Sequence, residues 1–217
     1  PNTAWKKNNL GKGWVLGETL ITGIGQGYIQ STPLQLCMMT AQIANGGFAV
    51  KPKIIVDSNP ISYEDAKQSM ESGLLFDTDS EELLDKKLFK NQRNIKIVQE
   101  AMFASTNERF GTSYKSRIDD PKYQFAGKTG TAQVKRISKR ERELDLELEQ
   151  IPYKDRDHAL YVAYGPYVNP RYALSIIVEH GGSGSKAAAP IAKKLFKLII
   201  DRHDLRNKQS NFERITV

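Results

Sequence analysis

Cysteine is almost absent from this sequence of 217 residues, in which Cys37 is the single example. One cysteine excludes an intrachain disulfide framework and a multi-cysteine zinc or iron–sulfur site. Cys37 lies inside an apolar run, where a small buried hydrophobe is a more ordinary role than a nucleophile. The three histidines, His158, His180 and His203, are scattered and form no HExxH pattern, so the sequence predicts neither a metal site nor a cofactor.

Long hydrophobic runs are also absent. No stretch of eighteen apolar residues occurs, so we expect no transmembrane helix inside the chain. The sequence begins at Pro1 with neither an initiating methionine nor a signal peptide. We therefore expect a piece of a longer protein, attached to a membrane only through an N-terminal segment that this chain lacks.

The charges favour no nucleic-acid partner. The net charge is +7, with 32 basic and 25 acidic residues. Residues 135–157 look basic but contain seven residues of each sign, so their net charge is zero. We interpret two segments, 57–90 and 135–157, as surface excursions or insertions. The first is acidic and irregular, with some helix expected near 81–89. Alternating leucines and acids in 135–157 hint at a hairpin arm.

The remaining pattern predicts an α+β fold with a largely antiparallel sheet flanked by helices. Residues 1–31 are glycine-rich and are predicted as loop. One helix is predicted to begin with Thr32 as its N-cap and Pro33 in its first turn, to run to Ala44 and to be buried on most sides. A second helix is predicted over 95–106. A strand is predicted over 123–134 and a short one over 50–56. A hairpin follows over 158–180, with its turn at Asn169 and Pro170. A last helix is predicted over 187–202, and the polar tail from 204 is expected to fray.

The residues that carry chemistry are Lys128, Thr129, Gly130 and Thr131. Lys128 and Thr129 offer an ammonium group and a hydroxyl, which together can bind a carboxylate. Gly130 lacks a side chain, so a substrate can approach the backbone closely. The N–H group of Thr131 can then face a developing oxyanion. The sequence thus predicts Lys128 and Thr131 as catalytic and all four residues as substrate-binding.

Motifs along most of the chain resemble those of class B penicillin-binding transpeptidases. Phe-Ala-Gly-Lys-Thr-Gly-Thr-Ala-Gln at 125–133 is similar to their third signature. A Gly-Gln-Gly loop at 25–27 and the Thr-Pro-Leu-Gln helix at 32–35 resemble segments upstream of it. Residues 158–166 and 179–190 are similar to the following strand, the last strand and the closing helix. The order agrees, and the elongation-type members, the penicillin-binding protein 2 group, resemble the chain most.

The resemblance implies part of a penicillin-binding/serine β-lactamase-like fold. It also implies a peptidoglycan D,D-transpeptidase that cross-links stem peptides through an acyl-serine and binds D-Ala-D-Ala peptides and β-lactams. Implied partners are elongation-complex membrane proteins, and the implied location is the periplasmic face of the bacterial inner membrane. On this interpretation residues 1–217 are the C-terminal portion of a transpeptidase domain.

The nucleophile of this family is missing here. Ser-x-x-Lys and then Ser-x-Asn or Ser-x-Asp should precede Lys-Thr-Gly. Residues 183–186 read Ser-Gly-Ser-Lys but follow it, and residues 105–107 read Ser-Thr-Asn but lie at the end of a helix. We interpret both matches as accidental. The isolated chain is therefore expected to be inactive, because loss of a serine nucleophile costs on the order of 10⁶ in kcat.

Two alternatives stay open. A non-catalytic β-lactam sensor or scaffold of the same fold would share these motifs, and the sequence before Pro1 would decide between it and an enzyme. A nucleotide-binding module is the other, because Gly-Ile-Gly-Gln-Gly-Tyr at 23–28 begins like the Gly-x-Gly-x-x-Gly fingerprint, although Tyr28 stands where the third glycine belongs.

Overall fold

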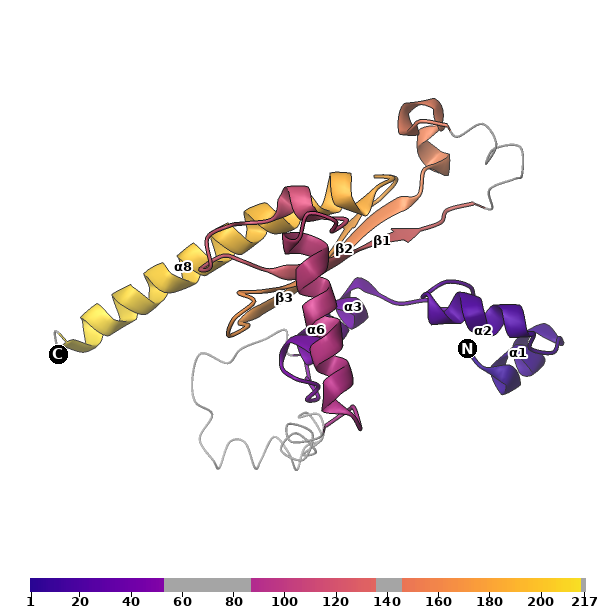
Figure 1. Ribbon diagram of the computed structural model, residues 1–217, viewed down its shortest axis with the longest axis horizontal. Coiled ribbons are helices and arrows are strands. Elements are labelled where there is room, and N and C mark those ends of the chain that lie inside the picture. The colour runs from indigo at the N-terminus through magenta and orange to yellow at the C-terminus, as the bar shows by residue number, and fades with distance from the viewer. Residues whose placement is uncertain (53–86, 136–145, 216–217) are drawn as a thin grey trace, which may run out of the picture.

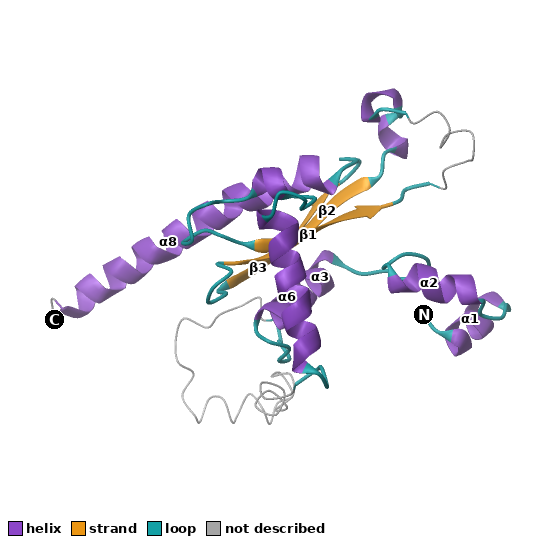
Figure 2. Ribbon diagram, in the orientation of Figure 1, coloured by secondary structure: helices purple, strands orange, loops and turns teal. Residues whose placement is uncertain are grey.

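A computed structural model of the chain describes residues 1–52, 87–135 and 146–215. A three-stranded sheet forms its centre, with the long helix α8 along one face and α3 and α6 on the other (Figure 1). Helices α1 and α2 lie apart from the sheet, beyond an extended connection to α3 (Figure 2). The α+β class and the antiparallel sheet predicted from the sequence are confirmed.

The sheet consists of β1 (Ala126–Ala132), β2 (His158–Gly165) and β3 (Tyr172–Val178), paired antiparallel in the order β1-β2-β3. The predicted hairpin is β2 and β3, and Asn169 in its turn has a φ of 60°, which asparagine tolerates well. Because side chains alternate along a strand, each strand contributes to both faces. Ala126 pairs with Tyr164 toward α3 and α6, whereas Thr129 pairs with Tyr161 toward α8.

The face toward α8 holds the main core. Helix α8 (Ala189–Ile215) presents Ala189, Ala192, Phe196 and Ile200 at helical spacing, all fully buried. A turn of π-helix, η4 (Gly184–Ala188), leads into it. The small side chains let the helix approach the sheet closely, so that the Phe196 ring stacks on Phe125 with 4.9 Å between ring centroids.

The opposite face packs against α3 (Pro33–Ala44) and α6 (Gln92–Asn107). Helix α3 begins as predicted, because the Thr32 side chain accepts a hydrogen bond from the Gln35 N–H while the Gln35 side chain accepts one from Thr32 N–H. The prediction that α3 is buried on most sides is wrong for this chain. Only Thr40 is buried, and Leu34 and Met39 are 54% and 43% exposed.

The prediction of loop over residues 1–31 is also wrong. They contain α1 (Thr3–Leu10) and α2 (Leu16–Gly23). Helix α1 is capped by the Asn2 side chain and ends at Gly11 in the left-handed region, so this glycine terminates a helix. Glu18 accepts a hydrogen bond from Val15 N–H and forms an ion pair with the buried Lys6, which ties the two helices together. The pairing with Lys6 lowers the pKa of Glu18.

The C-terminal tail and the two expected excursions differ in how they compare with the predictions. Helix α8 continues to Ile215, so the tail does not fray from 204 as predicted. Most of the predicted strand at 50–56 and of the excursion at 57–90 lies outside the described residues, as do 136–145. The described end of the second excursion forms short 3₁₀ helices, η2 (Leu148–Gln150) and η3 (Tyr153–Asp155), where a hairpin arm was expected. Within the described ranges, no helix combines the length and apolar character that crossing a bilayer requires.

Asp201 should make the docking of α8 sensitive to acid. Its Oδ1 accepts hydrogen bonds from the Tyr123 hydroxyl at 2.5 Å and from Lys122 Nζ at 2.9 Å, and these bonds lower its pKa. A carboxyl with a lowered folded-state pKa stabilises the fold above its unfolded-state pKa and loses that contribution as pH falls through the folded-state value. We expect Asp201→Asn to lose less stability than the wild type between about pH 6 and about pH 3, measured by chemical unfolding. Equal losses would contradict this.

Candidate functional site

The four predicted site residues lie together on β1, at one edge of the sheet. Lys128 pairs with Val162 and lies on the α3 and α6 face. Its side chain is exposed, and its Nζ donates to the Thr129 carbonyl at 2.8 Å and contacts Thr129 Oγ1 at 3.3 Å. The ammonium and the hydroxyl predicted to act together are therefore adjacent.

Alternate peptide groups of β1 are directed to its outer edge, away from β2. The Gly127 carbonyl accepts a hydrogen bond from Thr106 Oγ1 at 3.4 Å, and the Thr129 carbonyl accepts the one from Lys128. In an extended strand, residues two apart direct their peptide groups to the same side. The N–H group of Thr131 is therefore directed to this outer edge, away from β2, as an oxyanion donor requires.

Two glycines allow other segments to contact β1 closely. A side chain at Gly127 would collide with the Tyr161 hydroxyl, and one at Gly184 would collide with the carbonyl oxygens of Leu160 and Gly130. Gly184 therefore brings the start of η4 directly against the strand. Thr129 Oγ1 also lies 3.4 Å from Thr112 Oγ1, so the loop after α6 contacts the strand on the same side.

A buried hydroxyl cluster holds β1 in place, and the sequence did not reveal it. The Tyr161 hydroxyl lies 2.9 Å from Thr106 Oγ1 and 3.0 Å from Ser113 Oγ. All three residues are buried, and burial raises the pKa of Tyr161. No local signal could have found the cluster, because Thr106 and Ser113 are about fifty residues from Tyr161 in sequence.

The cluster bears on the Ser-Thr-Asn match at 105–107. Thr106 is fully buried in it, and Asn107 Nδ2 donates to the Phe125 carbonyl at 2.9 Å. Ser105 Oγ lies 3.2 Å from Thr112 Oγ1. The segment thus holds α6 to the residues around β1, which is a structural role and agrees with the interpretation of the match as accidental.

The Ser-x-x-Lys match at 183–186 opens η4, immediately before α8. Ser183 Oγ lies 3.0 Å from Ser185 Oγ. In the described part of the chain no lysine or histidine forms a hydrogen bond with the hydroxyl of Ser183. An activated serine needs such a base within reach.

Cys37 and the histidines have structural contacts. Cys37 Sγ lies 3.5 Å from the Ala173 carbonyl oxygen, and burial raises the pKa of its thiol, which disfavours the reactive thiolate. His158 Nδ1 accepts a hydrogen bond from the His180 N–H at 3.0 Å. Among the described residues, no three His, Cys, Asp or Glu side chains are grouped as a metal site requires.

The comparison with known families decides the identity of the fold. Residues 3–197 match the penicillin binding protein transpeptidase domain. The chain belongs to this family. The peptidoglycan D,D-transpeptidase MrdA of Salmonella typhimurium is 32% identical over 201 residues, which cover 93% of the chain and 30% of that protein. The chain therefore spans less than a third of the length of the curated relatives it matches.

Solved transpeptidase structures agree with the assignment. Penicillin-binding protein 2 of Pseudomonas aeruginosa, in complex with WCK 5153, is 33% identical to this chain, with a TM-score of 0.67. The matched region covers 91% of this chain and 37% of the Pseudomonas aeruginosa chain. The Helicobacter pylori protein, in complex with MreC, is 32% identical to this chain, with a TM-score of 0.65. The matched region covers 91% of this chain and 31% of the Helicobacter pylori chain. The predicted resemblance to the penicillin-binding protein 2 group is confirmed.

Proposed function

We propose that the chain supplies the substrate-binding edge of a peptidoglycan D,D-transpeptidase, with Lys128, Thr129, Gly130 and Thr131 as that edge. The observation that carries the proposal is the geometry of β1, an edge strand with an exposed ammonium and an outward Thr131 N–H. The name of the MrdA relatives supports the reaction, and family membership supports β-lactams as ligands.

The chemistry assigns each group a task. A stem peptide ending in D-Ala-D-Ala lies along β1 as an added strand, and Lys128 and Thr129 bind its terminal carboxylate. A serine outside this chain attacks the penultimate carbonyl, and the Thr131 N–H stabilises the oxyanion. The terminal D-Ala leaves with a proton, and an acyl-serine remains. An amine of a second stem peptide then attacks the acyl carbon, forms the cross-link and releases the serine.

The setting of the reaction follows from the same proposal. Stem peptides are cross-linked in the cell wall, so the chain acts on the periplasmic face of the bacterial inner membrane. We also propose elongation-complex membrane proteins as partners, and the complex of the Helicobacter pylori relative with MreC supports this. Residues 57–90 and 135–157 are proposed as surface insertions into the C-terminal portion of the domain.

Lys128→Ala tests the proposal in a protein that joins this chain to the remainder of a transpeptidase domain. We expect acylation by a labelled penicillin to slow by at least about tenfold, because a hydrogen bond to a charged group contributes roughly 1.5–3 kcal/mol. Lys96→Ala, at an exposed lysine of α6, is the matched control and should leave the rate unchanged. Equal acylation rates in the Lys128 variant and the wild type would overturn the assignment.

A further inference from the structure

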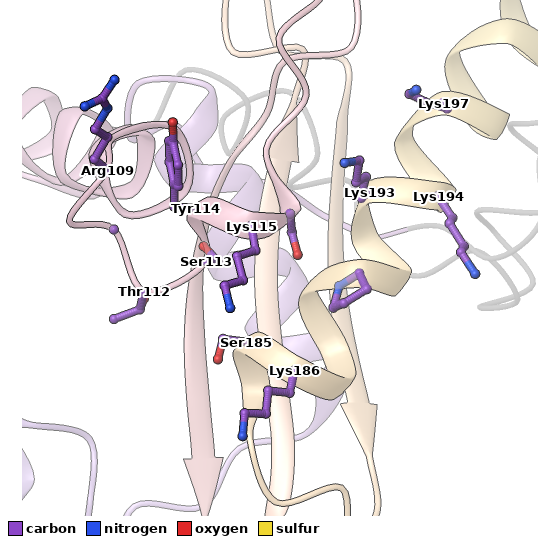
Figure 3. Close-up of a pocket in the computed structure, with 13 residues that line it drawn as sticks. Arg109, Thr112, Ser113, Tyr114, Lys115, Ser185, Lys186, Lys193, Lys194 and Lys197 are labelled. Atoms are coloured by element: carbon purple, nitrogen blue, oxygen red, sulfur yellow. The ribbon is translucent and has the colours of Figure 1, made fainter.

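A basic pocket lies between the loop that follows α6 and the first turns of α8 (Figure 3). Its volume is about 760 Å³, which is within the range of organic-ligand pockets. One wall is the segment 109–116, which includes the 3₁₀ helix η1 (Tyr114–Ser116), and the other is formed by residues of η4 and α8. Lys128, Thr129 and Thr131 do not line it.

Six cationic side chains line this pocket, and no Asp or Glu does. They are Arg109, Lys115, Lys186, Lys193, Lys194 and Lys197. Lys115 extends from η1 toward Ser185, Lys193 points from α8 toward η1, and Lys194 projects away on the other side of the helix (Figure 3). The lining cations therefore come from two segments about seventy residues apart in sequence, and Lys115 and Lys193 are the two that point across the space between them.

These cations lack anionic partners in the described ranges. None of the six forms an ion pair or a side-chain hydrogen bond there, and Lys197 acts on Asp201 only through its field, which lowers the pKa of that carboxyl. Further along α8 the pattern is different, since Asp201 and Asp204 both pair with Lys122. Like charges gathered without counter-charges repel one another, and a bound anion removes that repulsion.

Hydroxyl groups complete the lining. Thr112 and Ser185 add hydroxyl groups beside the ammonium groups, whereas the Ser113 hydroxyl is buried and donates to the Ser105 carbonyl. Ammonium and hydroxyl donors around one space match the several acceptor oxygens of a phosphate better than the two oxygens of a single carboxylate. The excess of positive charge likewise favours a ligand with more than one negative charge.

We propose that this pocket binds a phosphate-bearing ligand, namely a diphosphate or phosphodiester group attached to a larger organic body. The charge and the donors select the phosphate, and the volume leaves room for the attached body. The site adds to the proposed transpeptidase function and does not depend on it, because Lys128, Thr129, Gly130 and Thr131 are not among its lining residues.

The first test is a titration of the full chain with inorganic diphosphate at low salt, followed by calorimetry. We expect binding that weakens as salt increases, and a loss of about tenfold or more in affinity for the double variant Lys115→Gln/Lys193→Gln. The matched control, Lys12→Gln/Lys96→Gln, removes two exposed lysines elsewhere and should bind as the wild type does. Absence of binding, or an equal loss in the control, would overturn the proposal.

A second measurement needs no variant and is independent of folding defects. Acetylation of the wild-type chain, followed by mass spectrometry, should show Lys115 and Lys193 protected by diphosphate and Lys12 and Lys96 unprotected. Equal protection of all four would indicate non-specific screening and overturn the site. Poly-glutamate that competes as well as diphosphate would overturn the choice of phosphate.

Vesicles then separate the two sources of the ligand. Flotation with phosphatidylglycerol vesicles, but not with phosphatidylcholine vesicles, that is lost in the Lys115→Gln/Lys193→Gln variant would assign a lipid headgroup. Diphosphate binding without flotation would assign a soluble phosphorylated ligand. Flotation that the double variant retains would contradict a role for this pocket in lipid binding.

Discussion

The chain by itself is expected to form no covalent adduct with penicillin. Acylation needs a serine activated by a neighbouring base, and the Ser-x-x-Lys that should precede Lys-Thr-Gly does not occur in the 217 residues. Losing the nucleophile of a serine hydrolase costs on the order of 10⁶ in kcat. Incubation with excess labelled penicillin and intact-mass spectrometry should therefore show only the unmodified mass.

Ser183 is the residue at which this expectation can fail, because it begins the Ser-Gly-Ser-Lys match and opens a helical segment. An adduct mapped to Ser183 by peptide mass spectrometry, and lost in Ser183→Ala, would show that the match is functional. Joining the chain to a domain portion that contains Ser-x-x-Lys provides the positive control. In that protein the adduct should appear on the added serine and persist in the Ser183→Ala variant.

Phe196→Ala should produce the largest loss of stability among single substitutions in the described core. Phe196 is fully buried, stacks on Phe125 and lies so close to β2 that a side chain at Gly165 would come within 2.9 Å of its ring. Truncating a buried phenylalanine to alanine typically costs about 3–5 kcal/mol, since it removes apolar contacts and leaves a cavity. For a chain of this size, the midpoint of thermal unfolding should be roughly 6–20 °C lower than that of the wild type.

Phe110→Ala is the matched control, because Phe110 undergoes the same truncation while 80% exposed. Its midpoint should stay close to that of the wild type. Phe196→Leu should recover most of the stability, since leucine fills much of the space. If Phe196→Ala and Phe110→Ala unfolded at the same temperature, α8 would not be docked on the sheet through this ring.

Local sequence signals located the site strand and several element boundaries well. Thr32 and Pro33 predicted the start of α3, because capping depends on residues adjacent in the chain. The strand predicted over 123–134 is β1, which is shorter at Ala126–Ala132, and Asn169 and Pro170 predicted the hairpin turn between β2 and β3. Each of these features depends on backbone preferences within a few residues.

The first thirty residues show where local signals failed. Their glycines indicated loop, yet Gly11 ends α1 and Gly17 lies inside α2. The ion pair of Lys6 with Glu18 links the two helices, and glycine counts cannot reveal a contact between residues twelve apart. Similarly, apolar residues around α3 indicated burial, whereas Leu34 is exposed because no described segment covers that side.

The sequence by itself determined the family, the strand that carries Lys128, Thr129, Gly130 and Thr131, and the absence of an upstream Ser-x-x-Lys. Only the tertiary structure decided that β1 is an edge strand, that Tyr161 meets Thr106 and Ser113, and that lysines distant in sequence line one pocket. The physical reason is that composition and short-range periodicity constrain the backbone locally. Hydrogen bonds and charge clusters between remote residues exist only after the chain has folded.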